Sequence, residues 1–399
     1  MQAQRDAGID AHMLVLDRSG REDWGHEYAG PVRRIRIRAQ RFAAKRLCRI
    51  LSHHDRQAMR TLALFDAGLG PHVAALRPDV VHLHWLGAES AGLGDMAMVG
   101  TKARNGHGGQ AAAPVVWTCH DEWAFGGAAH YDGSDEYRHA FRARPFHDPD
   151  RWTMRRKMRK WQGWRPTLIA PSRWMAERAA QSPVARDWPV QVIPNTLPFD
   201  RFATQPRERA RETLGLNPDG YYLLSGAIGG TGDPRKGFDL LAAALDLLPP
   251  ELKARTTLLG FGGAKATSLV NGVTHHAFGP VDDERALAAI YNAADVFILP
   301  SRLDNLPNTL LEAQACGTPC LAFDVGGVMD ALPAPESALV PAFQIDAMAR
   351  AIVAQYSGIG DVDRARLRGH ALARFGGETV TAQHRSLYEE LIRTKGGEE

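Results

Sequence analysis

Residues 291–330, YNAADVFILPSRLDNLPNTLLEAQACGTPCLAFDVGGVMD, contain an apolar strand, a loop, a helix and a second strand in close succession. The first strand is expected to end at Pro300-Ser301, and the helix is expected to begin near Asn308-Thr309. The N-terminus of a helix offers free backbone N–H groups and the positive end of the helix dipole. The stretch therefore predicts a site for a phosphate group.

Two carboxylates accompany this predicted phosphate site. Glu312 lies one turn into the helix, where its carboxylate is placed to accept hydrogen bonds from a ribose diol while the helix amides hold the phosphates. Asp304 lies eight residues earlier, in the loop, and is placed to face the sugar end of the same ligand. The alternative is a carboxylate pair that only caps a helix. The Gly, Pro and Asn residues around the pair form a pattern more specialised than capping requires.

Outside this stretch, short apolar strands alternate with longer helix-compatible segments, which is typical of α/β proteins. Several strands are apolar at consecutive positions, as parallel strands covered on both faces should be. The expected strands are 11–16, 79–85, 114–119, 167–172, 190–195, 221–226, 256–261, 295–300 and 319–324. We therefore predict two doubly wound, Rossmann-like domains that face a cleft, with ligands at the carboxyl ends of the strands.

The domain boundary is expected near 196–205, where a Pro-containing polar stretch separates two series of strands. The two predicted domains cover residues 1–197 and 198–375. Residues 376–399 are predicted to form a terminal helix that crosses back to the first domain. The chain opens with the end of a helix and what looks like a second strand, so the first strand of the first domain is expected to be missing from it.

Composition limits the class of protein. The 399 residues are 44% hydrophobic and 23% charged, as in ordinary globular proteins. No run of apolar residues is long enough to span a membrane, and the start lacks the features of a signal peptide. The 4 cysteines have neither disulfide-scaffold nor zinc-site spacing. We expect reduced thiols and a cytoplasmic location.

The net charge of +3 conceals a basic first half and an acidic second half. Most of the basic excess lies in residues 31–50 and 151–165, and residues 31–50 alternate arginines with Val, Ile, Phe and Leu. Such a pattern suits an amphipathic segment in peripheral contact with an anionic membrane, at the inner face in a cytoplasmic protein. A solvated helix face is an equal alternative. Neither stretch has the spacing of an RNA-binding or zinc-finger motif, so no nucleic-acid partner is expected.

A second motif is LLSGAIGGTGDPRKGFDLLAAAL, residues 223–245. Lys236 follows a glycine loop and precedes a helix, where its ammonium would neutralise a diphosphate as a bound sugar leaves. A rival interpretation is a dinucleotide fingerprint formed by Gly226, Gly229 and Gly232, as in a nicotinamide-dependent oxidoreductase. That fingerprint requires an acidic residue at the end of the next strand, and this strand ends in glycines instead.

A third candidate site lies in the first half of the chain. The strand in residues 114–119 delivers His120 and Asp121 to its carboxyl end. The strand in residues 79–85 places His82 and His84 on one face, because side chains alternate along a strand. Two alternate histidines can bind a metal, but no third ligand follows at a recognisable spacing. A satisfied core histidine is the plain alternative for His120.

Together these motifs resemble the retaining glycosyltransferases of the two-domain GT-B type, in particular glycosyltransferase family 4 and its polysaccharide, colanic-acid-type subgroup. The family signature is two glutamates separated by seven residues, and Asp304 and Glu312 occupy those positions here. The resemblance covers nearly the whole chain. It implies transfer of a sugar from a nucleotide-diphosphate donor to a glycan or lipid-linked acceptor with retention of configuration. It also implies a front-face mechanism with no cofactor, an acceptor-side domain over 1–197 and a nucleotide-sugar-binding domain over 198–375. The Asp-x-Asp pairs Asp148/Asp150 and Asp361/Asp363 lie away from any strand end suited to diphosphate-bound Mg²⁺, so we predict transfer without a metal ion.

The resemblance assigns roles to individual residues. The catalytic candidates are His120, Lys236, Asp304 and Glu312. The donor-binding candidates are Gly226, Arg235, Lys236, Gly262, Asn305, Leu306, Asn308, Thr309 and Glu312. The acceptor-side candidates are His84, Trp85, Asp121, Trp123 and His130. In the family the missing first strand supplies a glycine-rich loop that faces the acceptor, so a catalytically impaired sugar-binding protein remains an alternative.

Overall fold

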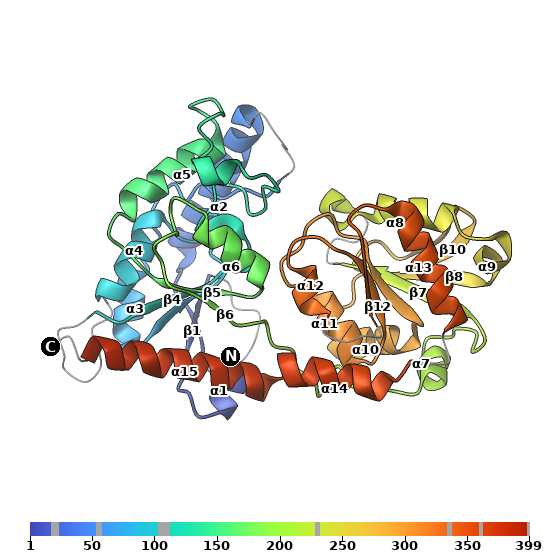
Figure 1. The fold of residues 1–399 in the computed structure, drawn as a ribbon. Helices are drawn as coiled ribbons and strands as arrows, with labels where there is room; N and C mark the ends of the chain where they lie inside the picture. The colour runs from blue at the N-terminus through green and yellow to red at the C-terminus, as the bar shows by residue number, and fades with distance from the viewer. Residues whose placement is uncertain are drawn as a thin grey trace. The chain divides into compact units, whose positions relative to one another are not determined.

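The computed structural model describes residues 1–16, 24–52, 58–102, 112–227, 232–332, 337–358 and 362–396. Gly229 of the rival fingerprint lies outside these residues. The chain divides into two compact units, one formed by Met1–Ile193 with Thr381–Glu399 and the other by Pro194–Val380 (Figure 1). The first unit ends a few residues before the boundary that the sequence predicts. The terminal helix α15, Gly377–Gly396, begins in the second unit and continues in the first.

The second unit contains a seven-stranded sheet in the order β13-β12-β11-β7-β8-β10-β9. Its strands pair in parallel except for β9 and β10, which form an antiparallel hairpin. The strands are β7 Tyr221–Gly226, β8 Thr256–Phe261, β9 Ala266–Val270, β10 Val273–Ala277, β11 Val296–Leu299, β12 Cys320–Phe323 and β13 Ala338–Val340. The central strands are buried at nearly every position, which is why continuous apolar runs predicted them.

Helices cover this sheet on both faces. They are α7 Arg207–Thr213, α8 Phe238–Asp246, α9 Pro250–Arg255, α10 Glu284–Ala293, α11 Asn308–Ala315, α12 Val328–Ala331, α13 Ile345–Ser357 and α14 Arg364–Phe375. Helices α8 and α13 lie on one side of the sheet, and α10 and α11 lie on the other (Figure 1). The sequence analysis missed β9, β10 and β13. The first of these is exposed at almost every position and so carries no apolar signal.

The first unit is built on a four-stranded parallel sheet in the order β3-β4-β5-β6. These strands are β3 Val81–Leu83, β4 Val115–Thr118, β5 Thr167–Ala170 and β6 Val190–Val192, all within ranges that the sequence predicted. The connecting helices are α3 Gly70–Leu76, α4 Leu93–Lys102, α5 Pro149–Lys160 and α6 Arg173–Ala180, with short turns η1 Glu122–Ala124 and η2 Glu136–His139. Ser172 caps α6 through a hydrogen bond from the Met175 backbone, which is an ordinary turn role.

The start of the chain is separate from this sheet. After α1, Gln2–Asp6, the predicted strand forms as β1, Met13–Val15. It pairs in parallel only with β2, Gly25–Glu27, which the sequence analysis did not predict. The β1 flank still packs on the unit's core, because Leu14 and Leu16 contact it.

Helix α2, Pro31–Leu51, contains the first basic stretch. Only Ile37, Gln40, Ala44 and Cys48 of this helix are buried, and they share one face because they recur at three- and four-residue spacings. Three of its arginines donate hydrogen bonds to backbone carbonyls of the same unit. Arg33 and Arg34 donate to backbone carbonyls that precede the helix, and Arg41 donates to the Ala88 carbonyl. The remaining surface of the helix is exposed.

The second basic stretch departs from the sequence prediction of a membrane-contacting surface. In α5 the Lys157 side chain is 0% exposed, and Arg156 donates to the carbonyls of Leu62 and Ala63. Trp161 and Trp164 join Trp117 and other aromatic rings in the core. Lys157 and the tryptophans of residues 151–165 therefore belong to the interior of the fold, whereas Arg155, Arg159 and Lys160 are exposed. None of the helices that the structure describes combines the length and apolar character needed to cross a membrane.

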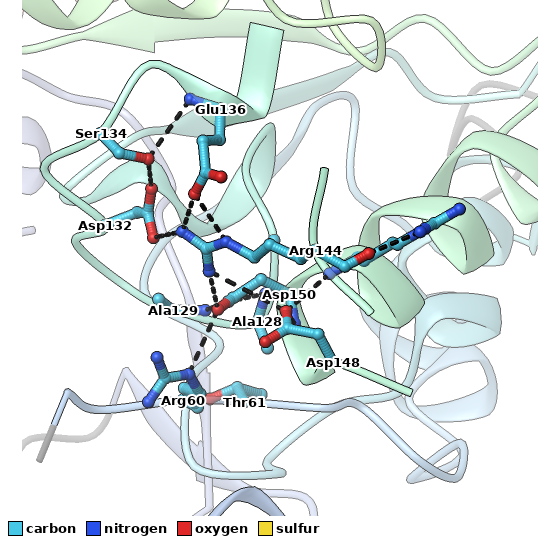
Figure 2. A network of polar contacts seen from close by, with 12 residues as sticks. Arg60, Thr61, Ala128, Ala129, Asp132, Ser134, Glu136, Arg144, Asp148 and Asp150 are labelled. Carbon is cyan, nitrogen blue, oxygen red and sulfur yellow. Dashed lines mark hydrogen bonds and ion pairs between the residues drawn. The ribbon is translucent and has the colours of Figure 1, made fainter. Parts of the chain in front are cut away.

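The Asp148 and Asp150 pair at the start of α5 is also structural. Asp148 caps the helix by accepting hydrogen bonds from two of its backbone N–H groups. Arg144 lies at the centre of a buried network in which it donates to Asp150 and Asp132, as Figure 2 shows. Burial raises the pKa of Asp150, and the adjacent arginines oppose this shift. Of the other predicted pair, Asp361 lies outside the described residues and Asp363 caps α14.

Candidate active site

In the second unit, the loops that follow β7 and β11 meet at the carboxyl ends of these neighbouring strands. The first loop ends in the turn η4, Pro234–Lys236, and Gly237 has a φ of +66° before α8 begins. A Cβ at Gly237 would lie 2.0 Å from the Pro300 carbonyl oxygen. Glycine is therefore needed both for the backbone conformation and for the close approach of the two loops.

This approach brings Lys236 to Asp304. The Lys236 ammonium donates to Asp304 Oδ2 at 2.7 Å, and the Ser301 hydroxyl donates to the same oxygen at 3.1 Å. Arg235 donates to the Leu303 carbonyl at 3.0 Å and lies 3.5 Å from Asp304 Oδ1. The Asp304 side chain is almost completely buried among these groups. The predicted cation and the predicted sugar-side carboxylate are thus in direct contact.

The backbone of the Asp304 loop is fixed from a second direction. The Gly327 N–H donates to the Asp304 carbonyl at 2.9 Å. A Cβ at Gly326, which has a φ of +56°, would lie 2.1 Å from that carbonyl oxygen. The glycines after β12 therefore allow the strand-end loops of β11 and β12 to pack together.

Glu312 is held by a residue that the sequence analysis missed. Tyr291, on α10, donates its hydroxyl to Glu312 Oε2 at 2.8 Å. Burial raises the pKa of Glu312 above its ordinary value, and the Tyr291 hydrogen bond opposes this shift. One carboxylate oxygen therefore has a fixed partner and the orientation of the group is set. The two residues are 21 positions apart, so no local spacing could reveal the pair.

The structure shows which contacts the other donor-binding candidates already make, and their predicted role stays a prediction. Asn305 and Leu306 are 3% and 5% exposed, so their side chains do not line an open surface. The Gly262 N–H is already used by the Gly279 carbonyl at 2.8 Å. Gly226 belongs to β7, and a Cβ there would come within 2.5 Å of the Phe261 ring, which gives this glycine a packing role.

Asn308 and Thr309 remain available at the start of α11. Asn308 is exposed and Thr309 is half-buried. No side chain caps the N-terminus of this helix, whose N-cap is Pro307. Asn195 donates to the Leu306 carbonyl at 3.4 Å and to Asn308 Oδ1 at 3.2 Å. Asn195 thus helps to fix the residues that lead into the helix.

In the first unit, the residues after β3 and β4 form a pocket at the carboxyl end of the sheet. Its lining includes the predicted residues His84, Trp85, His120, Asp121, Trp123 and His130. The rings of His84 and His120 share a hydrogen bond between Nδ1 and Nε2 at 3.1 Å. The Trp85 indole N–H donates to Asp121 Oδ2 at 3.0 Å, and the Trp85 side chain is 47% exposed. Trp85 is therefore oriented at its polar edge while its ring remains accessible.

Beneath Trp85 the pocket is largely buried. His130 Nδ1 lies 2.5 Å from Asp121 Oδ2, and His130 Nε2 lies 2.8 Å from the Thr61 hydroxyl. Trp123 is 2% exposed and donates its indole N–H to the Thr61 carbonyl at 2.8 Å. Trp123 is a core residue that also lines the pocket, and its predicted acceptor-side role stays a prediction. The contact with His130 helps to fix the orientation of the Asp121 carboxylate.

Lys157 supports the same loop from α5. Its ammonium donates to the carbonyls of Trp123, Gly126 and Gly127, and it lies 4.0 Å from the centre of the Trp123 ring. Three acceptors match the three N–H donors of an ammonium group. Burial lowers the pKa of Lys157 well below its ordinary value. Sequence analysis assigned this lysine to a basic surface and missed its place behind the pocket.

A row of histidines flanks the pocket. His82 stacks on His84 with 4.2 Å between ring centres, and its Nδ1 lies 2.6 Å from the Tyr388 hydroxyl of α15. Burial, followed by the neighbouring histidines, lowers the pKa of His82 well below its ordinary value. Burial also lowers the pKa of His120, and Asp121 opposes that shift. Across the described residues, no three His, Cys, Asp or Glu side chains gather in a way that could hold a metal ion.

Comparisons with known proteins agree with this architecture. The family model described as Glycosyltransferase Family 4 matches residues 1–201, about half of the chain. The model described as Glycosyl transferases group 1 matches residues 224–357, which include Lys236, Asp304 and Glu312.

The curated relatives are similar over part of their length. A D-inositol 3-phosphate glycosyltransferase from Xylanimonas cellulosilytica is 31% identical over 248 residues, which are 57% of this chain and 58% of the relative. D-inositol 3-phosphate glycosyltransferase 2 from Catenulispora acidiphila is 33% identical over 159 residues, 36% of each chain. The matched region thus spans between about a third and three fifths of these two relatives.

Solved structures extend the likeness in fold. Sucrose-phosphate synthase from Thermosynechococcus elongatus has a TM-score of 0.59 and 22% identity, covering 82% of this chain and 80% of that one. HepE from Anabaena, solved with UDP-glucose, has a TM-score of 0.59 and 18% identity, covering 81% of this chain and 82% of that one. The fold is the GT-B arrangement of two Rossmann-like domains, as predicted. Since the family model spans half of the sequence, the chain belongs to glycosyltransferase family 4.

Proposed function

We propose that this chain transfers a sugar from a nucleotide-diphosphate donor to a glycan or lipid-linked acceptor. The observation that carries the proposal is the cluster at the strand ends of the second unit, where Lys236 contacts Asp304 directly. A cation from the loop after β7 meets a buried carboxylate in the loop after β11, and that second loop leads into the uncapped N-terminus of α11. Phosphate recognition requires the cation and the helix amides, and sugar recognition requires the carboxylate.

Each group has a defined task in the proposed reaction. The Lys236 ammonium neutralises charge on the diphosphate as the glycosidic bond breaks. Glu312, oriented by Tyr291, accepts hydrogen bonds from the ribose hydroxyls. Asp304 holds the hydroxyls of the donor sugar. The positive charge comes from Lys236 and helix amides, so the proposal requires no metal ion and no cofactor.

The stereochemical proposal is retention of configuration by front-face substitution. A double displacement needs a carboxylate that is free to attack the anomeric carbon. Asp304 Oδ2 already accepts hydrogen bonds from Lys236 and Ser301, which makes it a poor nucleophile. In the front-face route, the leaving phosphate takes the proton of the acceptor hydroxyl, and the new bond forms on the side from which the phosphate departs.

The pocket of the first unit supplies the acceptor side of this proposal. Trp85 presents an exposed ring whose N–H is fixed by Asp121, and a sugar ring packs well on such an aromatic face. His120, which follows β4 and shares a hydrogen bond with His84, is the proposed catalytic residue of this pocket. The proposed setting is polysaccharide biosynthesis in the cytoplasm, at the inner face of an anionic membrane.

Thermal stabilisation by nucleotide sugars tests the donor site first. The purified chain should melt several degrees higher with one of the UDP-, GDP-, ADP- or dTDP-sugars and should not respond to NAD. Lys236→Met should remove most of this shift because the diphosphate loses its cation. Arg350→Met is the matched control, since Arg350 is an exposed arginine on α13 that pairs with the exposed Asp346, outside the cluster.

The outcomes separate the competing functions. Stabilisation by NAD alone would favour an oxidoreductase. A shift with a nucleotide sugar but no transfer to any acceptor would favour a sugar-binding protein with an impaired site. No shift with any nucleotide sugar would refute the proposed donor site.

A further inference from the structure

The outward face of α2 is apolar, the reverse of an ordinary surface helix. Phe42 and Ile35 are 70% and 67% exposed, and Val32 and Ile50 are exposed to a similar or greater extent. At about 100° per residue, these four side chains fall within an arc of about 80°. The opposite side of the helix holds the buried Ile37 and Ala44. We use the term outward face for the arc that contains Val32, Ile35, Phe42 and Ile50.

Cations surround and interrupt this arc. Arg46 lies within it, Arg38 and Arg49 border one side, and Arg36 borders the other, all with exposed side chains. The 21-residue helix contains no acidic residue. Single exposed apolar residues are normal on proteins, but an apolar stripe framed by cations on an isolated helix face indicates a partner.

We propose that the outward face of α2 lies in the interface of an anionic lipid bilayer. A bilayer offers hydrocarbon for Ile35 and Phe42 and anionic headgroups for the arginines at the same depth. Nucleic acid supplies the negative charge but no apolar surface for the centre of the stripe. A second copy of the chain would bring like charges together. Of these three partners, only an anionic bilayer matches both the cations and the apolar side chains of the outward face.

The helix is tied to the acceptor-side pocket by a short chain of hydrogen bonds. Arg41 donates to the Ala88 carbonyl at 2.6 Å, and the Ala88 N–H donates to the Thr61 hydroxyl at 2.8 Å. That hydroxyl lies 2.8 Å from His130 Nε2, and His130 contacts Asp121. Docking of α2 would therefore hold the pocket close to the membrane surface.

The link between α2 and the acceptor-side pocket indicates the class of acceptor, an inference that rests on the proposed function. An enzyme confined to the surface meets a membrane-borne acceptor at a much higher effective concentration than a dissolved one. Of the two proposed acceptor classes, glycans and lipid-linked acceptors, this chain thus uses the lipid-linked one. The α5 stretch makes no comparable surface, because Lys157 points into the core and Arg156 is bound to backbone carbonyls.

Co-sedimentation with vesicles tests the surface directly. The full chain should bind phosphatidylcholine vesicles that carry about 30% phosphatidylglycerol and should bind pure phosphatidylcholine poorly. Binding should fall steeply between about 0.05 M and 0.5 M salt. The double variant Arg46→Gln/Arg49→Gln should bind at least tenfold more weakly, at about fivefold per cation. Ile35→Ser/Phe42→Ser should also bind at least tenfold more weakly, because it loses the apolar anchors.

Two sets of controls make the result specific. Leu269→Ser removes a side chain that is 73% exposed on β9, and Arg155→Gln/Arg159→Gln removes exposed cations from α5. Both should bind vesicles like the unaltered chain. An equal loss in the α5 variant would mean general electrostatic attraction and would overturn the assignment to α2.

A further measurement separates this proposal from the proposed function. The α2 variants should keep the full thermal shift with the nucleotide sugar, since the donor cluster lies in the other unit. Absence of vesicle binding at low salt, with donor stabilisation retained, would refute the membrane surface and leave the transferase proposal standing. Loss of donor stabilisation in the unaltered chain would refute the transferase proposal instead.

Discussion

The two candidate sites of this chain lie in similar places but are assembled differently. In the second unit, Lys236 and Asp304 lie in the loops that follow two neighbouring strands, and the two side chains meet there. In the first unit, Asp121 and Trp85 also follow strands, but Asp121 is held by His130, which in turn contacts Thr61, 69 residues away along the chain. The first pocket further depends on Lys157, which comes from α5. We therefore call the proposed donor cluster local, because its charged residues come from two strand-end loops, and the proposed acceptor-side pocket tertiary, because its supports also come from a helix and a further loop.

This difference predicts how each site fails. A local site should lose function when one charged side chain is removed and should keep its fold. A tertiary site should lose stability and function together, because its supports are shared with the core.

Lys236→Met should have the largest effect on activity. Removing the cation that faces the diphosphate should lower kcat/KM about a thousandfold, or about 4 kcal/mol of transition-state stabilisation. The melting temperature without ligand should fall only modestly, because Arg235 and the Ser301 hydroxyl still contact the buried Asp304 carboxylate. Steady-state kinetics beside a melting curve measure both quantities. Turnover near that of the unaltered chain would show that Lys236 does not carry the diphosphate charge.

Lys157→Met should have the largest effect on stability. The change leaves three buried carbonyl oxygens without a donor, and the free energy of unfolding should fall by about 3 kcal/mol. Acceptor-dependent activity should fall as well, since the loop that contains Asp121 loses its support. Urea denaturation measures the first effect.

Lys160→Met is the control for this variant, because Lys160 is exposed on the same helix. It should change the free energy of unfolding by less than about 0.5 kcal/mol. Equal stability of the two variants would mean that the Lys157 contacts contribute nothing net.

The same contrast explains what the sequence revealed. The strands around Lys236 and Asp304 are continuous apolar runs, and the glycines and carboxylates stand at fixed distances from them. Such signals are local, so the GT-B fold could be predicted and the residues of the proposed donor cluster could be named from the sequence. Tyr291 and Thr61 carry no such signal, because their roles depend on contacts made after folding.

Charge patterns were ambiguous for a related reason. Residues 31–50 and 151–165 look alike in composition, but one leaves its apolar stripe exposed and the other places its lysine in the core. Composition does not show which face of a helix the core covers. The burial of Asn305 and Leu306 likewise depends on how the loop packs after β11.

Tyr291→Phe should have an intermediate effect. The variant removes the hydrogen bond that opposes the raised pKa of Glu312, so this pKa should rise further. Glu312 would then be protonated at a higher pH and would lose its ability to accept from the ribose. Donor affinity should fall about tenfold near neutral pH and more at lower pH.

Tyr222→Phe is the matched control for this variant. Tyr222 is also buried and donates its hydroxyl to the Asn217 carbonyl at 3.0 Å, within the same unit. Its loss should leave the dependence of donor affinity on pH unchanged. A titration of donor binding across pH distinguishes the two variants, and parallel curves would argue against a role for Tyr291 in setting the charge of Glu312.

The smallest expected effect is a pH dependence of stability in the first unit. The pKa of His82 is lowered by burial and by His84 and His384, so its neutral form is favoured in the folded state. Below the ordinary value of 6.5, the unfolded chain binds a proton that the folded chain excludes. The stabilisation is therefore complete above that pH and is lost as pH falls. For this half-buried side chain we expect a loss of roughly 1 kcal/mol between about pH 7 and pH 5.

His82→Gln should flatten this part of the profile. Glutamine keeps a donor and an acceptor for Tyr388 and Thr118, which His82 contacts at 2.6 and 2.7 Å, but it does not titrate. Chemical denaturation at several pH values compares the two slopes. A slope that is unchanged in the variant would place the acid sensitivity elsewhere, and the histidine row would then be a packing feature only. A reduced slope would show that the tertiary pocket, unlike the donor cluster, is sensitive to protonation of its own supports.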